Sequence, residues 1–482
     1  MDDAAEFLSQ FTVPTTCGAA QALAALDDRV TALIDRLAPQ PEDMRRRGAI
    51  IEYLEGFVER CFPGTRLLPY GSYITRIFLP DGDIDLICLC PRKDRDAVFQ
   101  ALSLALREIL GVSSPGIPAL TNLVEVRADV PVLKLMLDGI FVDISFASPA
   151  GLVTSLFLQL MDEAIGRAHL FKRSLLLVQA WCTYEAHVLG SHAQMLNSYC
   201  LRAMVCFILV HSPECVHPMQ VLLKFLGFFS CFDYGSATLT AFGVIDNSHL
   251  VDVGSRALYE YHLRNPVAAQ YIDQDTYAYL MMCRLLFRPE LQGVLFEDSE
   301  RSPEHPIAHA LKEAMNTSVP TDTGKPRGGH GRTIRTTRPS TQSTVPTSER
   351  LRVLLQNPSR LAQAVPLERG SPFASRILNV VDPVYPENNL GRALGGASLA
   401  RMRLTFQAGY AQVAALMSLV ADRTAPLTAI MAEFDLLFAN TFAHYSIEGL
   451  MPSEDISHRL SVSTGALYRR VVKVLAEYLE HP

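Results

Sequence analysis

Hydrophobic positions in the N-terminal part of the chain repeat at two different spacings. Residues 20–37 and 42–61 carry hydrophobic side chains three and four positions apart, which predicts two helices separated by a Pro-Gln-Pro segment. Residues 84–89 and 140–146 are short hydrophobic runs that predict strands, and a helical pattern over residues 95–110 lies between them. We therefore expect an α/β arrangement with a small sheet in this part of the chain.

The remaining sequence changes character twice. Residues 151–295 have mostly helical patterning, most clearly over residues 169–187 and 197–211. Residues 317–349 are rich in Thr, Ser, Pro and Gly, and we expect disorder there because so little hydrophobic surface can be buried. Helical patterning dominates again from Ser398 to the C-terminus.

The composition is that of a globular chain, with 482 residues of which 49% are hydrophobic and 19% charged. The net charge of -7 does not favour nucleic-acid binding, although a local basic groove would be compatible with it. Ten cysteines without regular spacing and the acidic start MDDAAEFLSQ predict an intracellular protein, nuclear or cytoplasmic, without a signal peptide. No apolar run approaches membrane-spanning length, so we expect no membrane association.

Two aspartates stand one residue apart in a hydrophobic run, within LPYGSYITRIFLPDGDIDLICLC at residues 68–90. Because strand side chains alternate between faces, Asp83 and Asp85 project to the same side. Asp143, in the motif FVDIS of the second predicted strand, can join them if the two strands are neighbours. Burying carboxylates is costly without a cation, and their hard oxygen atoms suit Mg²⁺ or Mn²⁺. Three carboxylates around two metal ions would promote in-line attack of a hydroxyl group on phosphorus.

Each of these motifs has a plainer interpretation. An Asp-x-Asp pair can belong to a sheet edge or a turn, and a Gly-Ser pair alone says little. Gly71 and Ser72, however, precede a predicted helical turn, where backbone N–H groups and a hydroxyl could hold a polyphosphate. Asp81, between Pro80 and Gly82, is expected in a turn rather than at a metal ion.

The Gly-Ser pair, the Asp-x-Asp motif and the distant Asp together resemble the signature of the DNA polymerase β nucleotidyltransferase superfamily. More narrowly, the motifs FLPDGDIDL, VDISF, HLFKRSLLLVQAWC and NNLGR resemble the noncanonical poly(A) polymerase and terminal uridylyltransferase group, especially a plant-type branch. The resemblance implies an α+β fold. It would comprise a polymerase β-like nucleotidyltransferase palm, with a small mixed sheet and helices, and a mostly helical central domain.

The resemblance and the changes in pattern divide the chain into five regions. They are residues 1–44 (an N-terminal helical region), 45–150 (the catalytic palm), 151–297 (the first part of the central domain), 298–370 (a largely disordered linker) and 371–482 (the second part of the central domain, with a nucleotide recognition segment and C-terminal helices).

Carried over by position, the resemblance implies a role for each matching residue. Asp83, Asp85 and Asp143 would be catalytic and would bind the metal ions. Ser72 and Ser198 would contact phosphate, and Tyr199 would stack on the base; without the resemblance Tyr199 would be interpreted as a core aromatic. The full set of nucleotide-binding residues would be Gly71, Ser72, Lys172, Gln179, Ser198, Tyr199, Asn388, Asn389 and Arg392.

Two positions depart from the pattern of the group. Relatives usually have a lysine that contacts the triphosphate where this chain has Gln179, and they tend to have Asn where it has Ala147. Lys172 or Arg173 could supply part of the missing charge, because Lys172 precedes Gln179 by two helical turns on nearly the same face. Alternatively, both side chains are solvated or pair with an acidic neighbour.

The expected activity is template-independent addition of nucleotides to an RNA 3′ end, as in polyadenylation, with ATP preferred over UTP. ATP is favoured because ENNLGR resembles the segment of adenylating relatives, and no histidine lies between Phe373 and Thr405. The chain has no familiar appended RNA-binding motif, so an RNA-binding adaptor protein is a further expected partner. A terminal uridylyltransferase, a nucleotide-joining (oligoadenylate or cyclic-dinucleotide) synthase and a noncatalytic RNA-binding homologue are the alternatives.

Overall fold

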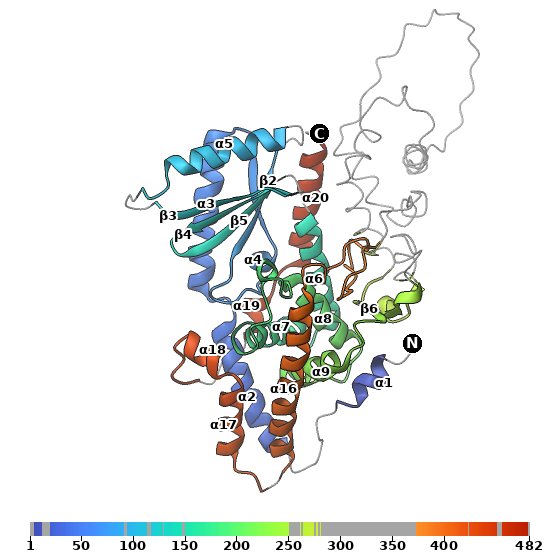
Figure 1. The fold of residues 1–482 in the computed structure, drawn as a ribbon. Coiled ribbons are helices and arrows are strands. Elements are labelled where there is room, and N and C mark those ends of the chain that lie inside the picture. The colour runs from blue at the N-terminus through green and yellow to red at the C-terminus, as the bar shows by residue number, and fades with distance from the viewer. Residues whose placement is uncertain are drawn as a thin grey trace, which may run out of the picture. The chain divides into compact units, whose positions relative to one another are not determined.

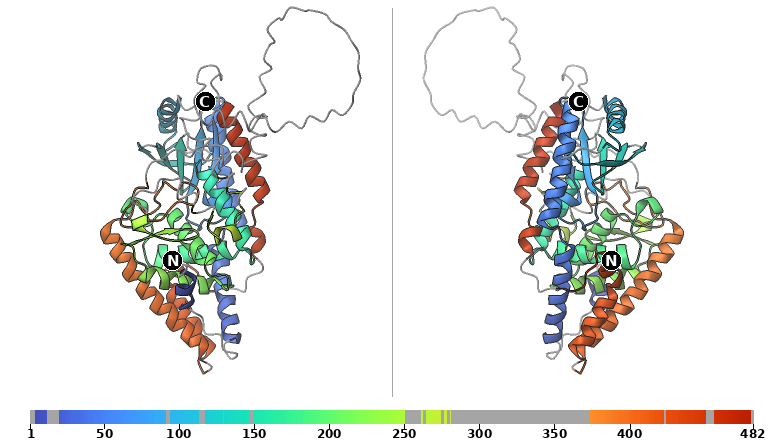
Figure 2. Two further views of the ribbon diagram at one scale, coloured as in Figure 1. Left: turned by 90° about the vertical axis from the view of Figure 1, so that its right-hand side faces the viewer. Right: turned by 90° about the vertical axis from the view of Figure 1, so that its left-hand side faces the viewer.

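The computed structural model describes residues 4–11, 20–90, 94–112, 117–128, 130–146, 150–249, 261, 264–273, 276–277, 280, 373–422, 424–450 and 456–480. Nearly all of them belong to one compact unit, which comprises residues 1–274 and 367–471 (Figures 1 and 2). The segment expected to be disordered, residues 317–349, lies outside the described residues, and so does Ala147.

A five-stranded mixed sheet forms the palm part of this unit. In spatial order its strands are β1 (Arg66–Tyr70), β2 (Ile84–Leu89), β5 (Ile140–Phe146), β4 (Val132–Leu137) and β3 (Leu120–Val126). β2 and β5 are parallel, and all other neighbours are antiparallel. The two strands predicted from sequence have the predicted bounds. β3 escapes prediction because it is an edge strand whose residues are mostly polar or partly exposed.

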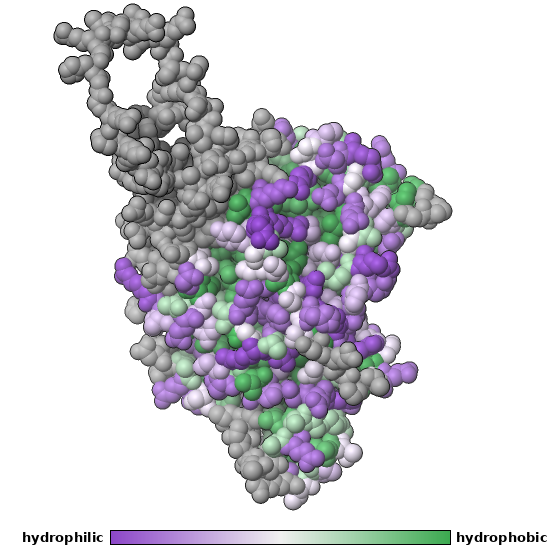
Figure 3. Space-filling model, turned by 180° about the vertical axis from the view of Figure 1, so that it is seen from behind, coloured by the Kyte–Doolittle hydropathy of each residue, from purple (hydrophilic) through white to green (hydrophobic). Residues whose placement is uncertain are grey.

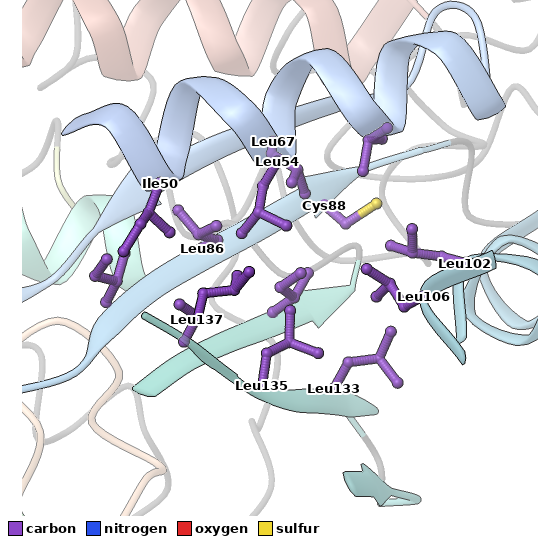
Figure 4. Packing of buried hydrophobic residues seen from close by; sticks show 14 of the residues in the cluster. Ile50, Leu54, Leu67, Leu86, Cys88, Leu102, Leu106, Leu133, Leu135 and Leu137 are labelled. Carbon is purple, nitrogen blue, oxygen red and sulfur yellow. The ribbon is translucent and has the colours of Figure 1, made fainter. Parts of the chain in front are cut away.

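Two helices cover one face of this sheet, namely α3 (Pro41–Cys61) and α5 (Arg95–Glu108). α3 begins with Pro41 in its first turn, and the side chains of Gln40 and Asp43 cap the helix start reciprocally. Hydrophobic side chains pack between the layers (Figure 4), with Ile50 and Leu54 from α3, Leu102 and Leu106 from α5, and Leu86, Cys88, Leu133 and Leu135 from the strands. The opposite face of the sheet is therefore the one available for polar side chains.

The rest of the unit is mostly helical. Its helices are α1 (Ala4–Ser9), α2 (Ala20–Leu37), α6 (Ala150–Ile165), α7 (Leu170–Ala180), α8 (Ser198–Val210), α9 (Pro218–Cys231), α16 (Gly396–Ala421), α17 (Leu427–Leu437), α18 (Ala439–His444), α19 (Ser457–Leu460) and the start of α20 (Thr464–Glu480). A π-helical turn, Trp181–Glu185, directly continues α7. α2 packs on α7, α9 and α17, so the N-terminal helix joins the helical part, whereas α3 joins the sheet.

A small hairpin brings two distant segments together. β6 (Ala237–Thr240) and β7 (Gly243–Asp246) pair antiparallel, and residues 379–381 add to the free edge of β6. There the N–H of Leu239 donates to the Asn379 carbonyl (2.9 Å), and that of Val381 to the Leu239 carbonyl (2.8 Å). This pairing anchors the segment expected to recognise the nucleotide, and the hairpin lies within a region, residues 151–295, whose pattern is mostly helical.

One described helix, α16, has the length and apolar composition of a membrane-spanning helix, contrary to the expectation that no such run exists. It packs along α9, with the Phe406 ring 5.4 Å from that of Phe225, and Gly409 lies against Trp181. These contacts bury one stripe of α16 against α9 and Trp181, and the other faces of the helix are partly or fully exposed. On the face seen in Figure 3, hydrophilic and hydrophobic residues are interspersed over the described surface.

Candidate active site

The register of the sheet places two of the three aspartates directly side by side. Asp85 on β2 and Asp143 on β5 are partners in the parallel pair. Asp83 lies just before β2 and, by the alternation of side chains, on the same face as Asp85. Ile84 and Leu86 are fully buried in the hydrophobic layer beneath. The structure thus brings the three carboxylates together on the sheet face that α3 and α5 leave uncovered.

The turn that leads into Asp83 is held by a buried arginine. The Gly82 N–H donates to the Leu79 carbonyl (2.8 Å), which closes the turn and confirms the predicted turn position of Asp81. Arg47 on α3 donates through Nη2 to the carbonyls of Pro80 (2.9 Å) and Gly82 (2.7 Å). Its guanidinium also lies over the Phe78 ring, 4.5 Å from the centroid.

Gly71 lies against Asp85 from the neighbouring strand. A Cβ atom at Gly71 would be 2.6 Å from Oδ2 of Asp85, so no larger residue fits without displacing that carboxylate. The Gly71 N–H donates to Oγ of Ser155 (2.9 Å), so it is engaged by the protein rather than directed to a ligand. Ser72 begins the helical turn α4 (Ser72–Thr75), as predicted, and is buried to 4% exposure.

Two cations act on the carboxylates. Burial and the charge of Asp83 raise the pKa of Asp85 to about 8, and burial and Asp143 raise the pKa of Asp83. Arg202 on α8 and Lys134 on β4 oppose these shifts. Lys134 also forms an ion pair with Oδ2 of Asp143, its partner across the β4–β5 ladder. Burial first, and the neighbouring carboxylates second, therefore disfavour the ionised forms of Asp83 and Asp85 unless a further cation joins them.

This donor set fits a magnesium-like cation that arrives with its substrate. Among the described residues, no group of three His, Cys, Asp or Glu side chains converges closely enough to hold a metal ion by itself. Mg²⁺, however, is usually held by one or two carboxylates together with water and substrate phosphates. Asp83, Asp85 and Asp143 supply hard oxygen atoms on one face, and the pKa values of Asp83 and Asp85, raised by burial and by neighbouring carboxylates, are those expected where a cation would relieve the cost of ionisation.

Lys172 does not lie with these residues. Its side chain is 1% exposed, and its Nζ donates to Oε1 of Gln159 (2.8 Å) and to the Leu460 carbonyl (2.7 Å). Asp162 lies 3.5 Å from the same nitrogen atom. The ammonium group is committed to this internal network, so a phosphate contact would require it to abandon three protein partners. Gln179 has no charge, and its buried Oε1 has no hydrogen-bond partner among the described residues.

The predicted stacking residue is tied to the predicted nucleotide recognition segment, residues 382–392. Tyr199, at the start of α8, donates through its hydroxyl to Oδ1 of Asp382 (3.0 Å). Asn197 caps α8 by accepting from the Cys200 N–H (2.7 Å) and donates to the Leu390 carbonyl (2.5 Å). Ser198 is exposed at the helix start. The two segments thus form one surface, although 183 positions separate Tyr199 from Asp382.

The two asparagines of the recognition segment differ in what they can bind. Asn389 is 3% exposed, accepts from the N–H groups of Val380 and Gly391, and donates to Asn379 and Ala374. All its hydrogen-bonding groups are used, so it is structural here and does not present a free edge to a base. Asn388 is only half-buried and contacts Asp382 and the exposed Arg392.

Three residues near the aspartates, Arg47, Lys134 and Arg202, are absent from the sequence-based set. Arg202 has the clearest signal, because it is the lone charge in the apolar helix SYCLRAMVCFILV and follows Ser198 by one helical turn. Lys134 alternates with buried leucines in β4 and so points to the aspartate face. Arg47 has no local signal, since its partners lie in a turn more than thirty residues away.

Two protein-family models match successive parts of the chain. Residues 26–163 match "Poly(A) RNA polymerase, mitochondrial-like, central palm domain", and residues 165–278 and 333–442 match "PAP/OAS1 substrate-binding domain". The part of the chain with the five-stranded sheet thus corresponds to the palm domain. The mostly helical part that follows corresponds to the substrate-binding domain. The chain belongs to the noncanonical poly(A) polymerase and terminal uridylyltransferase family of the DNA polymerase β nucleotidyltransferase superfamily.

Individual relatives match over shorter stretches. Protein HESO1 of Arabidopsis thaliana is 28% identical over 205 residues, which are 40% of this chain and 37% of that protein. Poly(A) RNA polymerase cid14 of Schizosaccharomyces pombe is 30% identical over 129 residues, 26% of this chain and 18% of that protein. The matches therefore span well under half the length of these relatives.

Solved structures are similar over most of the chain at low identity. A structure of Cid1, described for its RNA terminal uridylyl transferase activity, has a TM-score of 0.47 at 13% identity and covers 86% of this chain and 97% of its own. The polymerase core of TRAMP, an RNA surveillance complex, has a TM-score of 0.48 at 13% identity. The similarity covers 85% of this chain and 92% of the TRAMP chain.

Proposed function

We propose that the protein is a template-independent nucleotidyltransferase that adds nucleotides, preferentially AMP from ATP, to the 3′ end of RNA. The observation that carries the proposal is the pairing of Asp85 with Asp143 on one sheet face, with Asp83 beside them, in a chain of this family. In the reaction, the RNA 3′-hydroxyl loses its proton to solvent and its oxygen forms a bond to the α-phosphorus of ATP. The bond from that phosphorus to the bridging oxygen breaks, and pyrophosphate leaves with that electron pair.

Asp83, Asp85 and Asp143 would hold Mg²⁺ or Mn²⁺, which would stabilise the charge on the attacking and leaving oxygens. The protein's own contribution is to orient the reactants. Arg47 fixes the turn before Asp83, and Gly71 leaves room for the Asp85 carboxylate. Tyr199 would offer its ring to the base, which gives affinity without base selection because every base has a π-face.

Preference for ATP must come from hydrogen bonds to the edge of the base. Asn388 is the amide of the recognition segment that is only half-buried, and it offers both a donor and an acceptor once its contacts to Asp382 and Arg392 rearrange. The segment from Phe373 to Thr405 contains no histidine. A wrong base should cost only a few kcal/mol, so some incorporation of other nucleotides is expected.

Primer extension tests both the activity and the base. Purified protein with labelled oligo(A) RNA, Mg²⁺ or Mn²⁺ and each nucleoside triphosphate separately should extend the primer best with ATP. An equal mixture of ATP and UTP should give mostly adenylate tails. Changing Asp83, Asp85 or Asp143 to Asn should lower the rate about a thousandfold or more, because each change removes a ligand for the cation.

Asp96→Asn, at an exposed carboxylate on α5, is the matched control and should leave extension unchanged. Mostly uridylate tails would identify a terminal uridylyltransferase. Oligonucleotides formed equally well without the primer would identify a nucleotide-joining synthase. No extension with any triphosphate, alongside binding of RNA, would identify a noncatalytic homologue and overturn the proposal.

A further inference from the structure

Arg202 is a largely buried cation that donates to no described protein group. Its Nε atom is fully buried without a hydrogen-bond partner, and no other hydrogen bond or ion pair of its guanidinium occurs within the described part of the chain. Leaving the buried Nε–H donor without an acceptor is costly, and the guanidinium has four further N–H donors. A ligand with several acceptor atoms would satisfy them.

The surroundings of Arg202 place it at the aspartate side of α8. The charges of Asp85 and Asp83 act to raise the pKa of Arg202, against the larger lowering effect of burial. Arg202 also follows Ser198 by four positions, so both side chains project from one face of α8. Arg202 therefore lies within electrostatic range of the palm carboxylates and one helical turn from the exposed start of this helix.

The other cations that the sequence suggested for phosphate binding are engaged elsewhere. Lys172 is enclosed by Gln159, Asp162 and the Leu460 carbonyl. Arg392 donates to Asn388 in the recognition segment. Gln179 carries no charge, so the site needs a cation from another position if it is to hold a polyanion.

We propose that Arg202 binds the phosphate chain of the incoming nucleoside triphosphate and stabilises the pyrophosphate that leaves. This inference rests on the proposed function. A guanidinium presents a planar set of donors that matches two phosphate oxygens at once, and it stays charged next to the carboxylates. In this proposal the positive charge that contacts the phosphates belongs to α8, one helical turn beyond Ser198, and not to α7, where Gln179 lies.

Nucleotide binding without RNA tests the inference apart from catalysis. Affinities for ATP, AMP and inorganic tripolyphosphate are measured by calorimetry in Mg²⁺ for the wild type, Arg202→Gln, Arg202→Lys and the control Arg36→Gln, which removes one exposed charge from α2. Arg202→Gln should weaken the binding of ATP and of tripolyphosphate about ten- to a hundredfold, because a charge-assisted hydrogen bond is lost. Its affinity for AMP should change by less than about threefold.

Arg202→Lys should recover part of the loss for ATP, and Arg36→Gln should bind like the wild type. Melting temperatures measured on the same samples establish that each variant is folded, and Arg202→Lys keeps the test valid if Arg202→Gln does not fold. Equal loss of affinity for ATP and AMP, or none for either, would overturn the inference while leaving the proposed function standing. A wild-type protein that binds no ATP would overturn both.

Discussion

Gly71 adopts a φ of 68°, in the left-handed region, directly beside Asp85. Any other L-residue would be strained in this conformation, and its Cβ would also lie 2.6 Å from Oδ2 of Asp85. The second constraint distinguishes Gly71 from glycines that only serve a turn. Gly111, with a φ of 76°, has the same conformational need but no heavy atom close to where a Cβ would lie.

Gly71→Ala should therefore abolish most primer extension, because the added methyl group displaces the Asp85 carboxylate from its partners. Gly111→Ala is the control for a substitution at positive φ, since it adds backbone strain of about 1 kcal/mol without touching the site. Urea unfolding should show a loss of stability in both variants, and primer extension should fall in the first only. Equal activities would mean that Asp85 has room to move.

At the scale of elements, β3 and α5 are joined through one carboxylate. Glu125 on β3 accepts from Oγ of Ser103 (2.6 Å), Nη2 of Arg107 (2.9 Å) and Nη2 of Arg127 (3.2 Å). These hydrogen bonds, that of Ser103 foremost, lower the pKa of Glu125 to about 2. Since the unfolded chain has a pKa near 4.5, the ionised form stabilises the fold above that pH, and this contribution disappears as the pH falls toward 2.

Glu125→Gln should accordingly be less stable than the wild type at pH 7, and the difference should shrink as the pH falls from about 4.5 toward 2. The free energy of unfolding in urea, measured at several pH values, checks this. Glu108→Gln, on the exposed side of α5, serves as the control and should show no such trend. If the difference in unfolding free energy between Glu125→Gln and the wild type stays constant with pH, the loss of stability comes from neutral hydrogen bonds and not from the charge of Glu125.

At the scale of the whole described unit, the turn before Asp83 is tied to helices far along the chain. Asp81 accepts from the hydroxyls of Tyr184 (2.6 Å) and Tyr445 (2.9 Å), and Nε2 of His444 lies 3.2 Å from its other oxygen. The Tyr184 and His444 rings also stack, with centroids 4.4 Å apart. The carboxylate of Asp81, two residues before Asp83, therefore joins the palm to the π-helical turn and to the end of α18.

Asp81→Ala should keep substantial nucleotide addition, unlike changes at Asp83, because Asp81 is not among the proposed metal ligands. It should lower stability, and a double-mutant cycle with Tyr445→Phe should give a coupling of about 1 kcal/mol. Unfolding free energies of the four proteins provide the test. Complete inactivity of Asp81→Ala, with Asp83→Ala active, would reverse the assignment of the pair.

The sequence alone determined the elements whose own residues decide their environment. The strands around Asp85 and Asp143 are short hydrophobic runs, so their bounds could be predicted, and the side-chain alternation of any strand gave the common face of Asp83 and Asp85. Three helices were predictable for the same reason, because their own residues show how they are buried. Those at residues 20–37 and 41–61 bury one hydrophobic stripe, and the one at residues 198–210 is apolar almost all round. The tight turn at Asp81 followed from its Pro and Gly neighbours.

Only the tertiary structure decided which polar groups meet, because hydrogen-bond partners distant in sequence leave no periodic pattern. Lys172 has the spacing expected of a phosphate ligand, yet its partners on α6 and α19 enclose it. Asn389 has the chemistry to recognise a base, yet pairing of residues 379–381 with β6 uses every one of its groups. Arg202 stands out as the lone charge in an apolar helix, yet only the fold brings it within electrostatic range of Asp85 and Asp83. Burial and long-range pairing, rather than residue type, separate the polar residues that support the fold from those open to a ligand.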